Sequence, residues 1–204
     1  MNYKLYKNDF PATLKLNNEV AIDTETMGLN LNRDRLCLVQ LSFGDDIAHL
    51  VQISKNPNKK PKNLIKLLEN KNISKIFHFA RFDLAMLQKN ICDINGPIYC
   101  TKIASKLSRT FGAKHGLKDL CKDLLNIELD KSNQTSDWGI DKLTHEQLVY
   151  ASQDVLYLHK LKFCLNEILD REERIKLALE CFESLKTRVK LDLEGFQESD
   201  IFAH

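Results

Sequence analysis

The apolar pattern of this chain changes near residue 101, and that change limits the folds open to it. Before this point, short apolar runs alternate with turn-forming residues, whereas helical spacing fills most of the remaining sequence. We expect strands at residues 20–23, 36–43, 47–51, 75–79 and 98–100. We expect helices at residues 63–68, 81–89, 101–109, 116–126, 145–170 and 172–186. This order predicts an α/β fold, a mixed five-stranded sheet flanked by helices.

The length of 204 residues fits one ordinary domain with a complete core. We assign residues 1–187 to that domain and expect an irregular tail at residues 188–204. The tail carries apolar side chains along its whole length, namely Leu191, Leu193, Phe196, Ile201 and Phe202. A free chain end is seldom so apolar, so we expect the tail to dock on its own domain or on a neighbouring subunit.

Composition excludes several classes of protein. With 43% hydrophobic and 28% charged residues, the chain is typical of globular proteins rather than disordered ones. It has no apolar run long enough to span a bilayer, and its first ten residues lack the core of a secretory signal. The six cysteines form no CxxC pair, so we expect buried free thiols, a cytoplasmic location and no structural zinc. A net charge of +2 does not by itself indicate a nucleic-acid-binding protein.

Two carboxylates end the first expected strand. Asp23 and Glu25 follow an apolar run, and residues at i and i+2 of a strand point to the same side. Open sheets place ligands at such strand ends. Alone, the pair is equally well explained as two solvated acids.

Two further acidic positions lie in helical patterns. Asp83 stands between Phe82 and Leu84 near the start of a helix, where it could simply interact with the helix dipole. Tyr150 and Asp154 share a helix face at i and i+4, a spacing also common in plain packing.

Together, the four acids indicate a metal site. Carboxylates that converge from distant segments repel one another unless cations hold them, and an all-oxygen cluster suits Mg²⁺ or Mn²⁺. Two such ions about 4 Å apart form the arrangement that cleaves phosphodiesters. The sequence therefore predicts a metal-dependent nuclease.

The order of these motifs resembles the DEDD superfamily of 3′–5′ exonucleases, in its tyrosine-bearing branch that includes ribonuclease D. Asp23-x-Glu25, the Asp83 segment and Tyr150-x-x-x-Asp154 carry the resemblance, supported by residues 134–138. A closer resemblance, reaching both chain ends, is to the diribonucleotide-degrading nanoRNase C family. It rests on residues 33–37, 100–107, 115–117, 171–174 and 200–204.

The resemblance implies a ribonuclease H-like (DnaQ-like) fold and roles for five catalytic residues. Asp23 would bridge two Mg²⁺ or Mn²⁺ ions, with Glu25 and Asp154 on one of them and Asp83 reaching the other, directly or through water. Tyr150 would orient the attacking water. The products would be nucleoside 5′-monophosphates, and a ring-shaped homo-octamer is implied as the assembly.

Candidate substrate contacts come from a basic segment and from the resemblance. Lys102, Lys106 and Arg109 share one helical face, and no acid occurs from residue 100 to residue 118, so this edge is a candidate for binding the 5′ phosphate. A solvated helix face is the plain alternative. By resemblance, Leu29 would insert between the two bases, unless it is ordinary core. The full set of substrate-binding candidates is Leu29, His78, Lys102, Ser105, Lys106, Arg109 and His115.

Two other functions stay open from the sequence. The same chemistry could act on the 3′ ends of longer single-stranded RNA or DNA, because substrate length depends on whether the far end of the cleft is closed. A non-catalytic nucleic-acid-binding module is the second alternative, although it gives no reason for four like charges to stay together. In both cases we expect no membrane partner.

Overall fold

The computed structural model describes residues 2–56, 59–112, 114–130 and 135–203. Residues 57–58 and 131–134 lie outside this description, among them Gln134 of the ribonuclease D-like stretch. No helix within the described ranges is long and apolar enough to cross a membrane.

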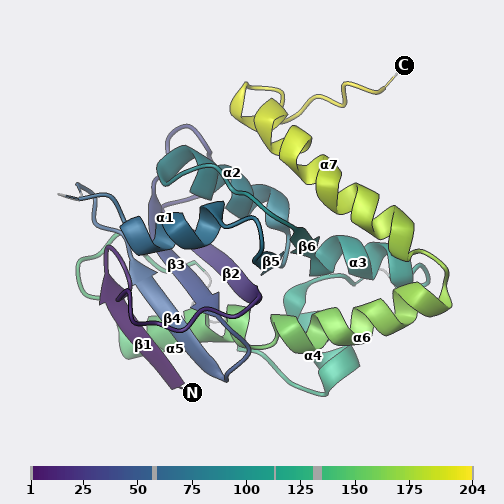
Figure 1. Cartoon of the computed structure of the whole chain (residues 1–204), viewed down its shortest axis with the longest axis horizontal. Coiled ribbons are helices and arrows are strands. Elements are labelled where there is room, and N and C mark those ends of the chain that lie inside the picture. The colour runs from purple at the N-terminus through teal and green to yellow at the C-terminus, as the bar shows by residue number, and fades with distance from the viewer. Residues whose placement is uncertain (1, 57–58, 113, 131–134, 204) are drawn as a thin grey trace.

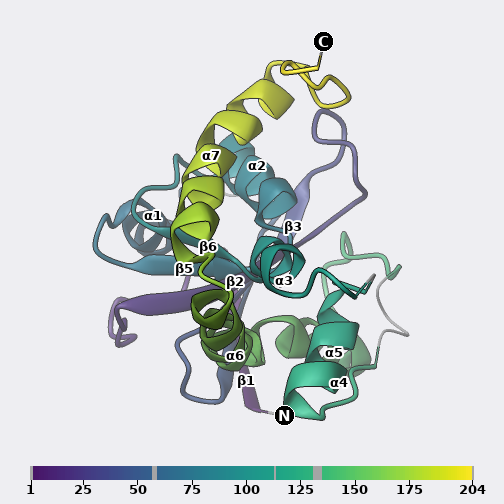
Figure 2. The ribbon, with the colours of Figure 1, turned by 90° about the vertical axis from the view of Figure 1, so that its right-hand side faces the viewer.

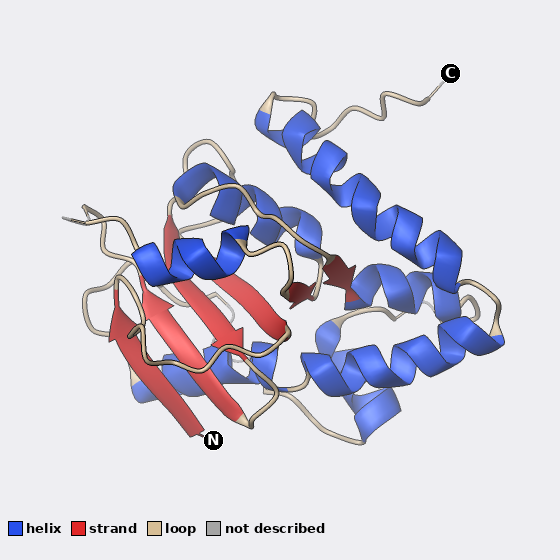
Figure 3. Cartoon of the chain, viewed as in Figure 1, coloured by secondary structure: helices blue, strands red, loops and turns tan. Residues whose placement is uncertain are grey.

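The described strands form one mixed sheet in the order β1-β4-β3-β2-β5-β6 (Figure 3). Their bounds are β1 Asn2–Lys7, β2 Glu19–Thr26, β3 Leu36–Ser42, β4 Ile47–Gln52, β5 Ser74–Phe77 and β6 Ile98–Cys100. β2, β3 and β4 pair antiparallel, while β1 joins β4, β5 joins β2 and β6 joins β5 in parallel. Every residue of β3 is buried, which explains its continuous apolar sequence.

The expected number of five strands was too low, because β1 forms a sixth at the outer edge of the sheet. Most of its side chains are exposed and none is fully buried. A strand with no buried face gives no apolar signal, so the pattern that reveals β3 is absent here.

Helices cover both faces of the sheet (Figure 1). α5 (His145–Leu156) packs across β1, β2, β3 and β4. α2 (Ala80–Asn90) contacts β2, β3 and β5 from the opposite side, and α1 (Lys62–Glu69) lies on the same side as α2. α5 and α2 thus approach β2, the strand of Asp23 and Glu25, from opposite faces of the sheet.

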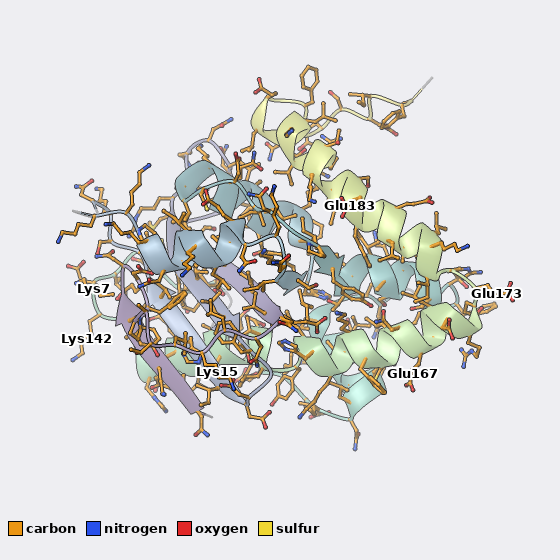
Figure 4. The ribbon with its side chains drawn as sticks, viewed as in Figure 1. Lys7, Lys15, Lys142, Glu167, Glu173 and Glu183 are labelled. Carbon is orange, nitrogen blue, oxygen red and sulfur yellow. The ribbon has the colours of Figure 1, made fainter. Side chains whose placement is uncertain are left out.

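The remaining helices form a second group beyond β6. They are α3 (Thr101–Ser108), α4 (Leu117–Leu125), α6 (Leu158–Arg171) and α7 (Ile175–Leu193). α3 packs on α6 and α7, and α7 runs back along α2 (Figure 2). Figure 4 labels charged side chains on the outside of the molecule: lysines near the strands, Glu167 on α6, Glu183 on α7, and Glu173 in the turn between these two helices.

Two expected helices have different bounds in the structure. The expected helix at 145–170 is two helices, because the chain turns at Tyr157 between α5 and α6. The last helix continues to Leu193, so the first residues of the expected irregular tail are helical. Val189 and Asp192 are buried on that extension, and α7 packs against α2. These contacts explain why the helix continues beyond residue 186.

All six cysteines are free thiols, as expected. Only Cys37, Cys100 and Cys121 are fully buried, while the others are partly exposed, so the expectation of uniformly buried thiols was half right.

Candidate active site

β2 places its two acids beside a gap in the sheet. The parallel pairing with β5 covers only Glu19 to Ala21, and β2 then continues to Thr26 without a neighbour on that side. Asp23 and Glu25 lie on this stretch, where β2 pairs with β3 alone, and face α5, while Thr24 between them points to the other side. The acids therefore lie within the strand rather than after it, at an edge that β5 leaves open.

A sharp turn after β5 brings in the third acid. Phe79, the residue before α2, adopts the left-handed conformation with φ of 66°, which is rare for a bulky side chain. It directs α2 back over the sheet, so that Asp83 reaches the gap from the first turn of the helix. Asp83 is 4% exposed and accepts a hydrogen bond from the Thr24 hydroxyl at 2.7 Å.

α5 contributes the last two candidates. Its start is fixed by a reciprocal capping box, in which the Thr144 side chain accepts from the Gln147 amide and the Gln147 side chain accepts from the Thr144 amide. Tyr150 and Asp154 then lie one turn apart on the face turned to β2, and both are buried. The Trp138 ring packs against the Tyr150 ring at 6.0 Å between centroids.

Three of the four acids form a compact ligand cluster. Asp23, Glu25 and Asp154 offer oxygen atoms that all lie within 4.8 Å of one another. Gln40 of β3 donates a hydrogen bond to Asp23 Oδ2 at 3.3 Å, which orients that carboxylate. Asp83 stands outside this triad, on the α2 side of the strand.

The electrostatics of the acids favour a bound cation. Burial, followed by repulsion from Asp154 and Asp83, raises the pKa of the Glu25 carboxyl to about 9. Burial likewise raises the pKa of Asp83 to about 7, although the hydrogen bond from Thr24 opposes that shift. Both carboxyls therefore favour the protonated form in the metal-free chain. A divalent cation that replaces the proton would ionise them. The donors are all carboxylate oxygens, which fits Mg²⁺ or Mn²⁺.

Tyr150 remains protonated at physiological pH. Burial raises its pKa above the usual range, and the nearby carboxylates of Asp154, Glu25 and Asp23 raise it further. A hydrogen bond links its side chain to Asp154. Its phenol is therefore an O–H donor fixed beside the acidic cluster.

A cleft of roughly 230 Å³ opens over these groups. Its lining includes all five residues expected to be catalytic, together with Leu29 and His78 from the expected substrate contacts. Leu29 is 80% exposed at the cleft, so the alternative reading of Leu29 as core is wrong. Its loop turns at Gly28, where any side chain would collide with the Asp34 carboxylate.

The basic edge lies beside this cleft rather than in its lining. The Lys102 ammonium sits 4.2 Å from the centroid of the Phe79 ring, which does line the cleft. Ser105 is buried and bonds His115 Nδ1 at 2.9 Å. Lys106 is exposed, and Arg109 is paired with Asp123.

Several residues around the site were missed by sequence reasoning. They are Thr24, Gln40, Leu117, Trp138, Phe79 and Phe82. Strand alternation could have placed Thr24 opposite the two acids. Gln40 is the only amide in a buried strand whose one other polar residue is Ser42, which is also a readable signal.

The comparisons with known proteins agree with this site. A sequence model described as 3′–5′ exonuclease matches residues 7–170. Ribonuclease D of Bartonella henselae is 32% identical over 163 residues, which cover 80% of this chain and 39% of that protein. The chain belongs to the 3′–5′ exonuclease family and is a ribonuclease D-like hydrolase. It spans about two fifths of the length of the curated relatives that it matches first.

Solved structures give a full-length match. Brucella melitensis NrnC with bound Mg²⁺ has a TM-score of 0.93 and 50% identity, and the alignment covers 100% of both chains. The same protein bound to pGG has a TM-score of 0.94 and 50% identity, covering 100% of this chain and 99% of that one. The expected resemblance to the DEDD exonucleases and to the nanoRNase C family is therefore confirmed, and so is the ribonuclease H-like fold.

Proposed function

We propose that this exonuclease hydrolyses diribonucleotides and very short RNA to nucleoside 5′-monophosphates. The observation that carries the proposal is the full-length match, at 50% identity, to a protein that binds pGG. The proposal concerns substrate length, since the class of reaction follows from the family.

The four acids are the proposed ligands of two Mg²⁺ or Mn²⁺ ions. By the family resemblance, Asp23 is the bridging candidate, with Glu25 and Asp154 completing one ion and Asp83 reaching the other. Asp23, Glu25 and Asp154 offer oxygen atoms within 4.8 Å of one another, as such a site requires. When bound, such a pair of ions activates the attacking water and stabilises the charge that develops on the leaving 3′ oxygen. The protein holds these carboxylates in place through Gln40 and Thr24.

Tyr150 is the proposed positioning group for the attacking water. In the metal-free chain its raised pKa keeps the phenolic proton in place, so its first proposed role is to orient the water by a hydrogen bond, with proton removal only where bound cations lower that pKa. Trp138 packs on its ring, which limits the rotation of the phenol.

The substrate contacts are proposed on the two sides of the acids. Leu29 projects from the rim, where it can separate two neighbouring bases, and His78 lies in the lining. Lys102, Lys106 and His115 are the candidates for the 5′ phosphate, with Ser105 holding His115. Arg109 has the weakest case, because Asp123 already neutralises it.

A length series tests the substrate. We would follow 5′-labelled RNAs from a dinucleotide to a heptanucleotide and expect fast cleavage of the dinucleotide alone. In the same assay, Lys102→Ala with Lys106→Ala should raise KM for the dinucleotide more than it lowers kcat. An unchanged KM would remove the two lysines from the phosphate site. A matched control is Lys142→Ala, which replaces an exposed lysine near the strands, away from the cleft.

A general 3′–5′ exonuclease on longer RNA or DNA is the second candidate. It is favoured by the ribonuclease D relatives, which match 80% of this chain. Equal shortening of long and short RNAs in the length series would support it. The complete set of acids leaves no support for a non-catalytic binding module.

We also propose that the chain forms a homo-oligomer in the cytoplasm, an octamer by the family resemblance. Phe196, Ile201 and Phe202 follow α7 and are 47%, 48% and 79% exposed, so the tail leaves apolar surface uncovered. A neighbouring subunit can cover it. The free thiols accord with a reducing compartment.

A further inference from the structure

Helix α2 carries Asp83 in its first turn, and Phe79, which precedes the helix, provides no side-chain cap. The Asp83 carboxylate accepts hydrogen bonds from the Thr24 hydroxyl, from the Thr24 backbone and from its own backbone amide. These bonds hold the carboxylate beside β2, and contacts made by other side chains of the first turn add to the orientation of the helix.

One of those contacts is a two-pronged ion pair with the end of α7. Arg81 Nε donates to Asp192 Oδ2 at 2.6 Å, and Arg81 Nη2 donates to Asp192 Oδ1 at 2.8 Å. The Asp192 side chain is 2% exposed, whereas that of Arg81 is 37% exposed. Two parallel hydrogen bonds fix the guanidinium plane, so this pair defines an orientation as well as a distance.

The same carboxylate is held from its own helix. Arg188 bonds Asp192 Oδ1 with both Nε and Nη2, at 3.0 and 2.7 Å. The two arginines also donate to backbone carbonyls of the segment after α7: Arg81 to Gln197 at 2.8 Å and Arg188 to Ser199 at 3.1 Å. Arg81 thus connects α2 to a carboxylate near the end of α7 that Arg188 also contacts.

The ion pair of Arg81 with Asp192 lines a second cleft, which adjoins the catalytic cleft. This second cleft of roughly 240 Å³ is lined by Leu31, Phe79, Arg81, Phe82, Asp192, Gln197 and Glu198. Phe79 and Phe82 also line the catalytic cleft, so the two share a wall. Residues on both sides of Arg81 therefore face the reaction site.

We propose that Asp192 is a positioning residue, which acts through Arg81 to set the first turn of α2 and so the place of Asp83 in the metal site. The inference rests on the proposed role of Asp83 as a metal ligand. It gives the C-terminal helix a function in catalysis that its distance along the chain does not reveal. Displacing a catalytic group by about 1 Å can cost on the order of 100-fold in rate, so a lost orientation has a measurable effect.

The alternative is that the cluster only stabilises the fold. Removing one partner of a buried ion pair is destabilising, because the remaining charge is left without compensation. Loss of activity in an Asp192 variant would therefore be uninformative alone. Arg188 supplies the matched control, since Arg188→Gln removes contacts to Asp192 and to the tail but leaves the pair between Arg81 and Asp192 intact.

The test compares Arg81→Gln, Asp192→Asn and Arg188→Gln in the full chain. For each we would measure Mn²⁺ binding calorimetrically without substrate, then kcat and KM on a dinucleotide, and the melting temperature. We expect Arg81→Gln and Asp192→Asn to weaken Mn²⁺ binding and to lower kcat about 10-fold or more, with little change in KM. Arg188→Gln should lower the melting temperature but keep Mn²⁺ affinity and kcat within about twofold of the wild type.

Two outcomes would overturn the inference. In the first, folded Arg81→Gln and Asp192→Asn proteins bind Mn²⁺ and turn over like the wild type. In the second, all three variants lose kcat in proportion to their melting temperatures. If Asp83→Asn itself leaves Mn²⁺ binding unchanged, the proposed metal role of Asp83 fails instead, which separates the two proposals.

Discussion

Four carboxylates lie close together in this protein, and the free energy of that arrangement depends on what neutralises them. Of the Glu25 and Asp83 carboxyls, Glu25 has the larger pKa shift, with a pKa of about 9 in the folded chain against an ordinary value of 4.5. A raised carboxyl pKa means that the folded state prefers the protonated form. Its stabilising effect is complete below the ordinary pKa and is lost as the pH rises towards the folded-state pKa.

The metal-free protein should therefore become less stable as the pH rises from about 5 to about 9, and Mn²⁺ should restore the loss. Glu25→Gln should flatten this dependence and raise the metal-free melting temperature at alkaline pH by a few degrees, roughly what 1 kcal/mol gives in a chain of this size. It should also abolish activity. Thermal melts with and without EDTA measure both effects. Glu167→Gln, an exposed change on α6, is the control, and equal profiles for the two variants would contradict the prediction.

At the scale of elements, the site depends on the turn that connects β5 to α2. The turn requires Phe79 in a conformation that L side chains disfavour, at φ of 66°. The ring gains contacts in return, because it lines the cleft and lies under the Lys102 ammonium. A conformation that the local sequence opposes persists only where surrounding contacts determine it.

Phe79→Gly and Phe79→Ala separate the backbone from the ring, since both remove the ring and only glycine relieves the backbone. We expect the glycine variant to be more stable than the alanine variant by about 1 kcal/mol, the reverse of the order in a helix. Both variants should raise KM. Urea unfolding of the two proteins gives the comparison. An alanine variant as stable as the glycine variant would show that the turn is unstrained.

The elements that sequence analysis missed have a common physical cause. β1 has no fully buried residue, and the continuation of α7 to Leu193 is stabilised by contacts with α2, far away in the sequence. Apolar periodicity reports local burial only, so neither feature has a local signal. By contrast, β3 is buried throughout and was predicted nearly to its ends.

The residues of the site likewise fall into those that local spacing predicts and those that only long-range contacts determine. The spacings in Asp23-x-Glu25 and Tyr150-x-x-x-Asp154 are local, so strand and helix geometry place each pair on one face without further information. The ion pair of Arg81 with Asp192 joins residues 111 positions apart, and nothing in the sequence around either residue indicates the other. The pairing of Arg109 with Asp123 likewise weakened a phosphate contact that looked sound on one helix face.

At the scale of the whole molecule, the C-terminal segment is held at its start and exposed at its end. Deleting residues 200–204 removes Ile201 and Phe202, but keeps Asp192 and the carbonyls of Gln197 and Ser199. We expect this deletion to reduce the proposed homo-oligomer to smaller species, with little loss of Mn²⁺ affinity. Light scattering after size exclusion measures the mass against 23.6 kDa for one chain. An unchanged mass would mean that the exposed apolar end takes no part in assembly.

The central claim is that the converging acids hold the cations that cleave a dinucleotide. Its most direct test is single-turnover hydrolysis of a 5′-labelled GG dinucleotide by the wild type and by Asp23→Ala, each with Mn²⁺ and with EDTA. We expect the wild type to release the labelled nucleoside 5′-monophosphate rapidly with Mn²⁺ and not with EDTA. We expect the hydrolysis rate to fall on the order of 1,000-fold or more with EDTA or with Asp23→Ala, because groups that act as a unit fail together. Cleavage that survives either change within about tenfold would contradict it.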